Sequence, residues 1–238
     1  MKLTITFLFW SLSLSCHLSS QDADFQGLLQ NYRKDYLIQY PILGSQFGQG
    51  EVDHLLPIAD AAYRERERMM YEHYMEEIKQ VAPSRLNSTL QGEYHRLWRE
   101  LEQGWKRAQS NETYWQDPTL YDAGLAIKYI LEREDLSIRQ RMANIYKRLQ
   151  QIPPYYEAAK KNIQKAKIRQ LNLALRLNRA GFSYLRKDLR TQAQKSVLSS
   201  QEQQRFMEKL RLAELAIKDY IAFCNSLIFD HYDRERYE

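Results

Sequence analysis

Residues 115–163 read WQDPTLYDAGLAIKYILEREDLSIRQRMANIYKRLQQIPPYYEAAKKNI, and this stretch decides the expected fold. The Asp117 side chain can cap a helix N-terminus, and Pro118 is a residue favoured in the first helical turn. Together they predict the start of a helix. Ser137 can cap a second helix, whose apolar side chains recur every three or four residues: Ile138, Met142, Ile145, Leu149 and Ile152. Pro153-Pro154 predicts the end of that helix, because proline has no amide hydrogen to donate.

The same helical spacing extends over the rest of the chain. It predicts helices over residues 25–40, from Pro57 to about Val81, and after Pro83. A Gly-rich loop over residues 44–50 should reverse the chain between the first two of these helices. From Tyr155 the chain is expected to form a long helix, either continuous or interrupted, that reaches towards Leu189, with Gly181 as a plausible weak point. Residues 199–203 match a capping box before the last helix.

The composition favours an all-α protein. Valine occurs only three times, and the chain has 8 Gly and 6 Pro, so the β-branched runs and frequent turns of a sheet protein are missing. We expect about seven helices packed as antiparallel hairpins, with a long basic helix as a candidate connection.

Several short motifs link the sequence to a known family. They are Trp115-x-Asp117-Pro118 with Tyr121, Arg141 before Arg148-Leu149-x-x-Ile152-Pro153, Ala159-Lys160-x-Asn162-Ile163, and upstream Tyr40-Pro41, Gly48 and Asp53-His54-Leu55-Leu56. In these residues the chain resembles the bacterial family catalogued as domain of unknown function 885. The resemblance implies a helical protein related to zinc peptidases, whose His-Glu-x-x-His motif lies further along a longer chain.

No catalytic, cofactor or metal residue can be assigned in this chain. A zinc-peptidase helix needs two histidines one turn apart with a glutamate between them, and the histidines here are widely separated. The sequence reaches Glu238 without such a motif. We therefore favour a protein that is not an enzyme and holds neither zinc nor another cofactor. Cys224 falls in the apolar stripe of the last helix and is expected to be a buried hydrophobic side chain.

The first residues resemble an export signal. A single Lys2 precedes a short apolar run, and small residues lead to Cys16. We predict a signal peptide over residues 1–15, cleavage before Cys16, and lipidation of Cys16 that anchors the protein to a membrane facing the periplasm or the cell surface. The alternative is an ordinary secretory peptide that leaves a soluble periplasmic or secreted protein. Residues 22–230 are expected to form the helical domain resembling the N-terminal region of the family, followed by a polar tail over 231–238.

Two groups of side chains are candidates for a binding surface. Residues 160–190 contain ten Lys or Arg and a single acid, although the whole chain has a net charge of only +5. We single out four lysines of this segment and three tryptophans that lie before it: Lys160, Lys161, Lys165 and Lys167, with Trp98, Trp105 and Trp115. The simpler interpretation is that the lysines keep a helix solvated and the tryptophans belong to the core.

Three functions follow from these features. The first is a non-catalytic binding or scaffolding module with a groove for a peptide or protein. The second is a truncated or split half of a zinc peptidase whose metal-binding part is on another chain. The third is a protein that binds anionic surfaces through residues 160–190. Nucleic acid is the partner expected least, because the protein is predicted to be exported.

Overall fold

A computed structural model describes residues 20–237, with side chains described for 20–231. This part of the chain is helical and contains no strand, so the all-α prediction is confirmed. The helices of nine or more residues are α1 (Ser20–Gln39), α3 (Ala61–Lys79), α4 (Ser88–Ser110), α6 (Ala123–Leu131), α7 (Ile138–Asn162), α8 (Ile168–Tyr184) and α10 (Ser200–Tyr237). The shorter elements are α2 (Pro41–Gln46), α5 (Glu112–Gln116), α9 (Arg190–Gln194), the 3-10 turns η1 (Gly50–Val52), η2 (Pro83–Arg85) and η3 (Pro118–Leu120), and the π-helical turn η4 (Leu185–Leu189).

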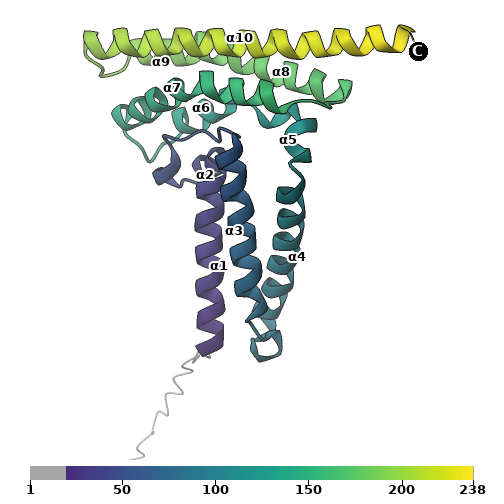
Figure 1. Cartoon of the computed structure of the whole chain (residues 1–238). Coiled ribbons are helices and arrows are strands. Elements are labelled where there is room, and N and C mark those ends of the chain that lie inside the picture. The colour runs from purple at the N-terminus through teal and green to yellow at the C-terminus, as the bar shows by residue number, and fades with distance from the viewer. Residues whose placement is uncertain (1–19, 238) are drawn as a thin grey trace, which may run out of the picture.

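Helices α1, α3 and α4 run side by side and form a three-helix arm (Figure 1). Their shared core is rich in aromatic rings: Phe25, Tyr32, Tyr71, Tyr74 and Tyr94 are buried there together with leucines of α4. The ring of Tyr71 packs closely against α4 because Gly104 has no side chain, and a Cβ atom at Gly104 would come 2.1 Å from that ring. The arm is thus a small bundle with its own core.

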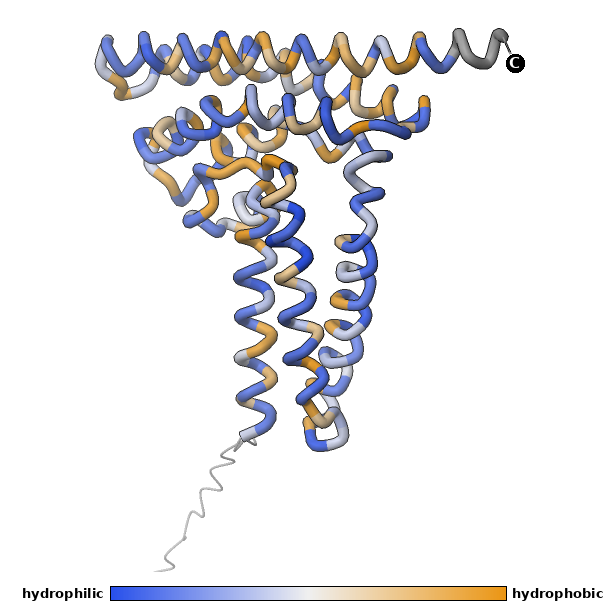
Figure 2. Tube along the Cα trace, in the orientation of Figure 1, coloured by the Kyte–Doolittle hydropathy of each residue, from blue (hydrophilic) through white to orange (hydrophobic). Residues whose placement is uncertain are grey.

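Helices α6 to α10 form the head, which lies across one end of the arm (Figure 1). Helix α10 runs along α7 and α8 and covers both. The head has a second core, in which Ile127, Ile145, Leu149, Ile152 and Ile217 are fully buried. Hydrophobic and hydrophilic residues alternate along the long helices (Figure 2), and none of the helices in residues 20–237 is long and apolar enough to span a bilayer.

Local capping signals fix several helix starts. Ser137 and Gln140 form the predicted capping box at the start of α7. Ser199 and Glu202 exchange the corresponding hydrogen bonds before α10. The predicted start at Pro57 was wrong: α3 begins at Ala61, because the Asp60 side chain accepts a 2.8 Å hydrogen bond from the Tyr63 amide and caps the helix there.

The prediction that Pro153-Pro154 ends a helix was also wrong. Helix α7 continues through both prolines to Asn162. Tyr155, Tyr156 and Ala159 follow the prolines and are buried in the head core. Burial of that face stabilises the helix more than the lost backbone hydrogen bonds destabilise it, and tertiary packing overrides the local preference.

The long helix expected from Tyr155 is interrupted, and the interruption falls between Asn162 and Ile168 rather than at Gly181. The chain reverses after Asn162, where the amides of Gln164 and Lys165 each donate a 3.0 Å hydrogen bond to the Trp115 carbonyl. Helix α8 then begins at Ile168 and passes through Gly181 without a break. Beyond Tyr184 it continues as η4 and α9 to Gln194.

The structure describes the C-terminal end of the sequence almost completely but not the N-terminal end. The predicted signal peptide and Cys16 lie outside the described residues. At the other end, the segment predicted as a polar tail continues α10 as helix to Tyr237. Cys224 is buried in the head, and burial raises its pKa to about 11, so its thiol is protonated at neutral pH.

Candidate functional site

A cleft of about 390 Å³ lies where the arm meets the head. Its walls come from α1, α2, α3, the C-terminal end of α4, α5 and α6, so residues far apart in the sequence line one space. Six of the lining side chains are tyrosines: Tyr36, Tyr40, Tyr63, Tyr114, Tyr121 and Tyr129. The charged lining residues are Glu67, Asp122 and Arg107.

Glu67 lies at the centre of a tyrosine network in this cleft. Its side chain is almost fully buried, and its two oxygens accept hydrogen bonds from the hydroxyls of Tyr40 and Tyr114, the latter at 2.8 Å. The Tyr40 hydroxyl also lies 3.1 Å from the Tyr71 hydroxyl. Burial is the main cause that raises the pKa of both Tyr40 and Tyr114 above the ordinary value, and the charge of Glu67 adds to the rise. These hydroxyls therefore stay protonated and donate to the carboxylate.

The floor of the cleft is the turn from Asp117 to Asp122, which the head holds rigidly. The Tyr220 hydroxyl donates to the Pro118 carbonyl at 2.8 Å, and the Tyr155 hydroxyl donates to the Leu120 carbonyl at 2.9 Å. Asn178 donates to the Tyr121 carbonyl at 3.0 Å. The predicted helix start at Asp117-Pro118 is only the single turn η3, and α6 begins after Asp122. These hydrogen bonds to three carbonyls of the turn hold the floor in one conformation.

Asp122 and Arg107 place opposite charges in the cleft. The Asp122 carboxylate accepts from the Leu125 amide at 2.9 Å as the cap of α6, while burial raises its pKa. Arg107 comes from α4, and its positive charge opposes the effect of burial on the pKa of Tyr36 and Tyr71. The lining therefore carries more acidic than basic groups.

The motif residues that carried the family resemblance have architectural roles around this cleft. Arg148 is fully buried and donates to the Pro41 carbonyl at 3.1 Å, the Ser45 hydroxyl at 2.6 Å and the Val52 carbonyl at 3.2 Å. It fastens α2 and η1 to α7. Desolvation lowers its pKa to about 10, which still leaves it charged at neutral pH.

A second motif residue, Asn162, joins the end of α7 to the turn before α3. Its amide donates to the Ala59 carbonyl at 2.7 Å and to the Tyr121 hydroxyl at 3.1 Å, and its oxygen accepts from Arg64 at 2.9 Å. Ala59 and Tyr121 both line the cleft. Arg148 and Asn162 thus set the position of the cleft walls.

The three tryptophans proposed as a binding surface lie elsewhere. Trp98 packs against the arm core and stacks on Tyr94, with ring centroids 6.1 Å apart. Trp105 is 37% exposed on α4, and Trp115 is half-buried on α5. None of the three lines the cleft. The cleft could not be predicted from the sequence because its tyrosines are spread over about ninety positions; Tyr40 and Tyr121 of the family motifs were the available signal.

The four lysines also differ from one another. Lys160 forms ion pairs with Glu157 at 2.7 Å and Asp219 at 2.5 Å, so its charge is matched. Lys161, Lys165 and Lys167 are exposed.

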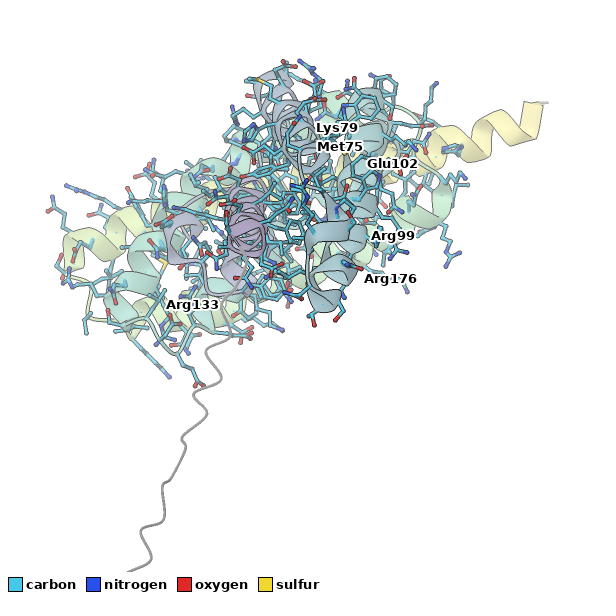
Figure 3. All side chains as sticks on the ribbon, turned by 90° about the horizontal axis from the view of Figure 1, so that it is seen from below. Met75, Lys79, Arg99, Glu102, Arg133 and Arg176 are labelled. Carbon is cyan, nitrogen blue, oxygen red and sulfur yellow. The ribbon has the colours of Figure 1, made fainter. Side chains whose placement is uncertain are left out.

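Further along, five more basic side chains are exposed on α8 and η4: Arg169, Arg176, Arg179, Arg186 and Lys187. We call these eight exposed residues the basic stripe; none forms an ion pair with an acidic side chain in residues 20–231. In Figure 3, Arg176 of this stripe lies on the other side of the arm from Arg133.

The histidines of residues 20–231 do not form a metal-binding cluster. His73 lies 3.5 Å from Glu77 on the same helix, and His231 Nε2 lies 3.0 Å from the Ala166 carbonyl. Over the described residues, no group of three His, Cys, Asp or Glu side chains is arranged to hold a metal ion.

The sequence of this chain matches a known protein family. The model of the family described as "Bacterial protein of unknown function (DUF885)" matches residues 41–234, which include the arm–head junction and the whole head. The chain belongs to this family. The family resemblance inferred from the motifs is therefore confirmed.

A solved structure similar to this family member is described as "a putative lipoprotein of unknown function from Shewanella oneidensis". The two share 23% sequence identity, and their TM-score is 0.82 over 88% of this chain. The match covers 38% of that chain, so this chain spans well under half of its length. At this identity the likeness establishes the fold alone. Among curated proteins none matches this chain significantly.

Proposed function

We propose that this chain is a non-catalytic helical binding module and that its ligand site is the cleft between arm and head. The cleft itself carries the proposal. Ligand sites are concave, largely apolar and aromatic, and contain a few placed polar groups, and their volumes are on the order of 300 to 1,000 Å³. A cleft of about 390 Å³ lies within that range and suits a small organic molecule or one or two side chains of a peptide.

Preorganisation supports the same proposal. The hydrogen bonds from Tyr155, Tyr220 and Asn178 hold the floor before any ligand arrives. A ligand that enters a preformed site does not have to order the protein, so more of its interaction energy contributes to affinity.

A matched pair of leucines tests this proposal. Leu125 lines the cleft and is 37% exposed, and Leu173 is 39% exposed on α8, outside the cleft. We would screen a library of small aromatic fragments by ligand-observed NMR against the wild type, Leu125→Trp and Leu173→Trp. Fragments should bind the wild type and Leu173→Trp, and binding should be lost in Leu125→Trp, whose larger ring fills the space. Binding that survives in Leu125→Trp, or a library without hits on the wild type, would refute the proposal.

We further propose that the module is exported and is held at a membrane by lipid on Cys16. The support is the signal-like sequence before Cys16 and the printed description of the similar Shewanella oneidensis structure as a putative lipoprotein. The anchored module would then act in the periplasm or at the cell surface.

Binding of an anionic surface through the basic stripe is a second candidate function. The specific observation in its favour is that all eight side chains are exposed and lack an acidic partner within residues 20–231, whereas Lys160 and Arg190 beside them are paired. Arg169, Arg176 and Arg179 are separated by seven and three residues, so they project from the same side of α8. Such an array attracts anionic lipid or polyanions.

A further inference from the structure

The cleft combines a buried carboxylate with pairs of aromatic rings. Tyr36 and Tyr40 lie with ring centroids 4.6 Å apart, and the rings of Tyr63 and Tyr114 are perpendicular, with centroids 6.4 Å apart. Glu67 joins the two pairs, because it accepts hydrogen bonds from Tyr40 and from Tyr114. Two pairs of tyrosines therefore flank one carboxylate in a single space.

Among the side chains of residues 20–231, Glu67 has no cationic partner. None of the ion pairs formed within residues 20–231 includes it, although its side chain is only 8% exposed. A buried carboxylate without a countercharge is costly even when it is hydrogen-bonded, because hydroxyl dipoles replace only part of the lost hydration. A positive charge that enters the cleft would offset this cost.

Three of the protein's own cations near the cleft, those of Arg64, Arg66 and Arg68, already contact other groups. Arg64 donates to Asn162 and to the Ala59 carbonyl, and Arg68 pairs with Glu65 and Glu72. The guanidinium of Arg66 lies 5.9 Å from the centroid of the Tyr63 ring, so this ring already accepts a cation over one face. Arg107 is the cation that lines the cleft, and its charge acts on Tyr36 and Tyr71.

We propose that the cleft binds an alkylammonium group, held by the charge of Glu67 and the faces of the surrounding tyrosines. Aromatic rings attract quaternary and primary ammonium ions through their negative faces, and the attraction strengthens where water is excluded. Glu67 supplies the charge, and Asp122 adds negative potential at the α6 side of the cleft. This inference rests on the proposed function of the cleft and specifies its ligand class.

The two sources of such a group are a free quaternary ammonium compound and the side chain of a lysine. Choline and n-butylamine represent them. The neutral compound 3,3-dimethylbutan-1-ol has the shape of choline with carbon in place of the charged nitrogen, so it measures the contribution of shape alone.

Calorimetric titration of the full chain with these three compounds tests the proposal. At least one of the two ammonium compounds should bind about tenfold more tightly than the neutral alcohol. The better of the two identifies the source. Equal affinity for charged and neutral compounds would overturn the cationic ligand class but leave a ligand-binding cleft intact. Failure of all three to bind would also overturn it, while the aromatic-fragment screen reports on the cleft independently.

Variants locate the charge. Glu67→Gln keeps the shape of the side chain and one accepting oxygen, and its amide nitrogen can donate to the second tyrosine hydroxyl. This variant should abolish the preference for the ammonium compound. Arg107→Gln removes a competing positive charge and should increase that preference. Asp35→Asn is the matched control, because Asp35 accepts a 2.6 Å hydrogen bond from Tyr74 but does not line the cleft. An unchanged preference in both Glu67→Gln and Arg107→Gln would refute the proposal, and Arg107→Gln decides alone if Glu67→Gln does not fold.

Discussion

Gly124 of α6 and Gly181 of α8 meet backbone against backbone, and a Cβ atom added to Gly124 would lie 2.2 Å from the Cα of Gly181. A Cβ atom on Gly181 would lie 2.9 Å from the Cα of Gly124. The absence of both side chains lets α6, which carries part of the cleft wall, lie close against α8.

Gly181→Ala should therefore destabilise the protein. The added methyl group must push apart two helix backbones, and overpacking of this kind costs about 1–3 kcal/mol. Gly92→Ala is the control: Gly92 is exposed in α4 with nothing within 4 Å of its added Cβ, so alanine should stabilise by up to about 1 kcal/mol through helix propensity. Urea unfolding of both variants measures the difference. Equal effects of the two substitutions would contradict the close helix crossing.

Alkaline pH should unfold the protein steeply. Burial raises the pKa of Tyr71 and Tyr121 from 10.0 to about 12, so the unfolded state releases these protons before the folded state does. Below about pH 10 each of these tyrosines contributes about 3 kcal/mol to the free energy of unfolding. This contribution is lost as the pH rises towards about 12. Arg148 acts in the opposite sense, because its folded pKa is lowered to about 10, but it is a single group.

The test is urea unfolding at several pH values between about 8 and 11, with tyrosinate absorbance followed in parallel. The free energy of unfolding should be nearly constant at first and then fall. Tyr71→Phe should make the fall shallower than in the wild type. A free energy that stays level through this range would show that the tyrosines titrate freely.

Lipidation of Cys16 should place the mature protein in the membrane fraction. Each buried methylene contributes about 0.8 kcal/mol, so several acyl chains together make release negligible. Cys16→Ser should leave the protein soluble or unprocessed. Mass spectrometry of the mature N-terminus gives the decisive reading, and an unmodified residue there would end the lipoprotein proposal.

Reversal of charge on the basic stripe should abolish binding to anionic vesicles. We would replace Lys161, Arg176 and Arg179 by Glu and keep Lys160, whose charge is already matched by Glu157 and Asp219. Wild-type binding should weaken with salt, because exposed charges are screened beyond about 8 Å at 0.15 M. Reversal of Lys34, Arg96 and Lys106 on the arm, each paired with a glutamate, serves as the control. Similar vesicle binding by both triple variants would exclude the stripe as the contact surface.

Local signals in the sequence predicted much of the helical fold. Ser137 with Gln140 and Ser199 with Glu202 form their capping boxes because every atom involved lies within one helical turn. The error at Pro153-Pro154 has the opposite origin. The force that continues α7 comes from burial of Tyr155 and Tyr156 against distant helices, which local propensity does not contain.

The candidate site was less accessible to sequence analysis for a related reason. Glu67 stands in the alternating charges of residues 64–68, a pattern typical of a solvated helix face, yet it is buried by Tyr40 and Tyr114 from other segments. Arg148 was noticed as part of a family motif, but its partners at Pro41 and Val52 are about a hundred positions away. Such relationships exist only after the chain has folded.

If lipid holds the chain at Cys16, the length of the arm affects how far the cleft lies from the membrane. Helix α1 has 20 residues and is therefore about 30 Å long, and it separates Ser20 at the free end of the arm from Tyr36 and Tyr40 at the cleft (Figure 1). An arm standing upright on a bilayer would raise the cleft well above the headgroups, whose layer adds only about 5 to 8 Å on each side of the hydrocarbon. The occupant of the cleft would then come from the surrounding aqueous space rather than from the lipid phase.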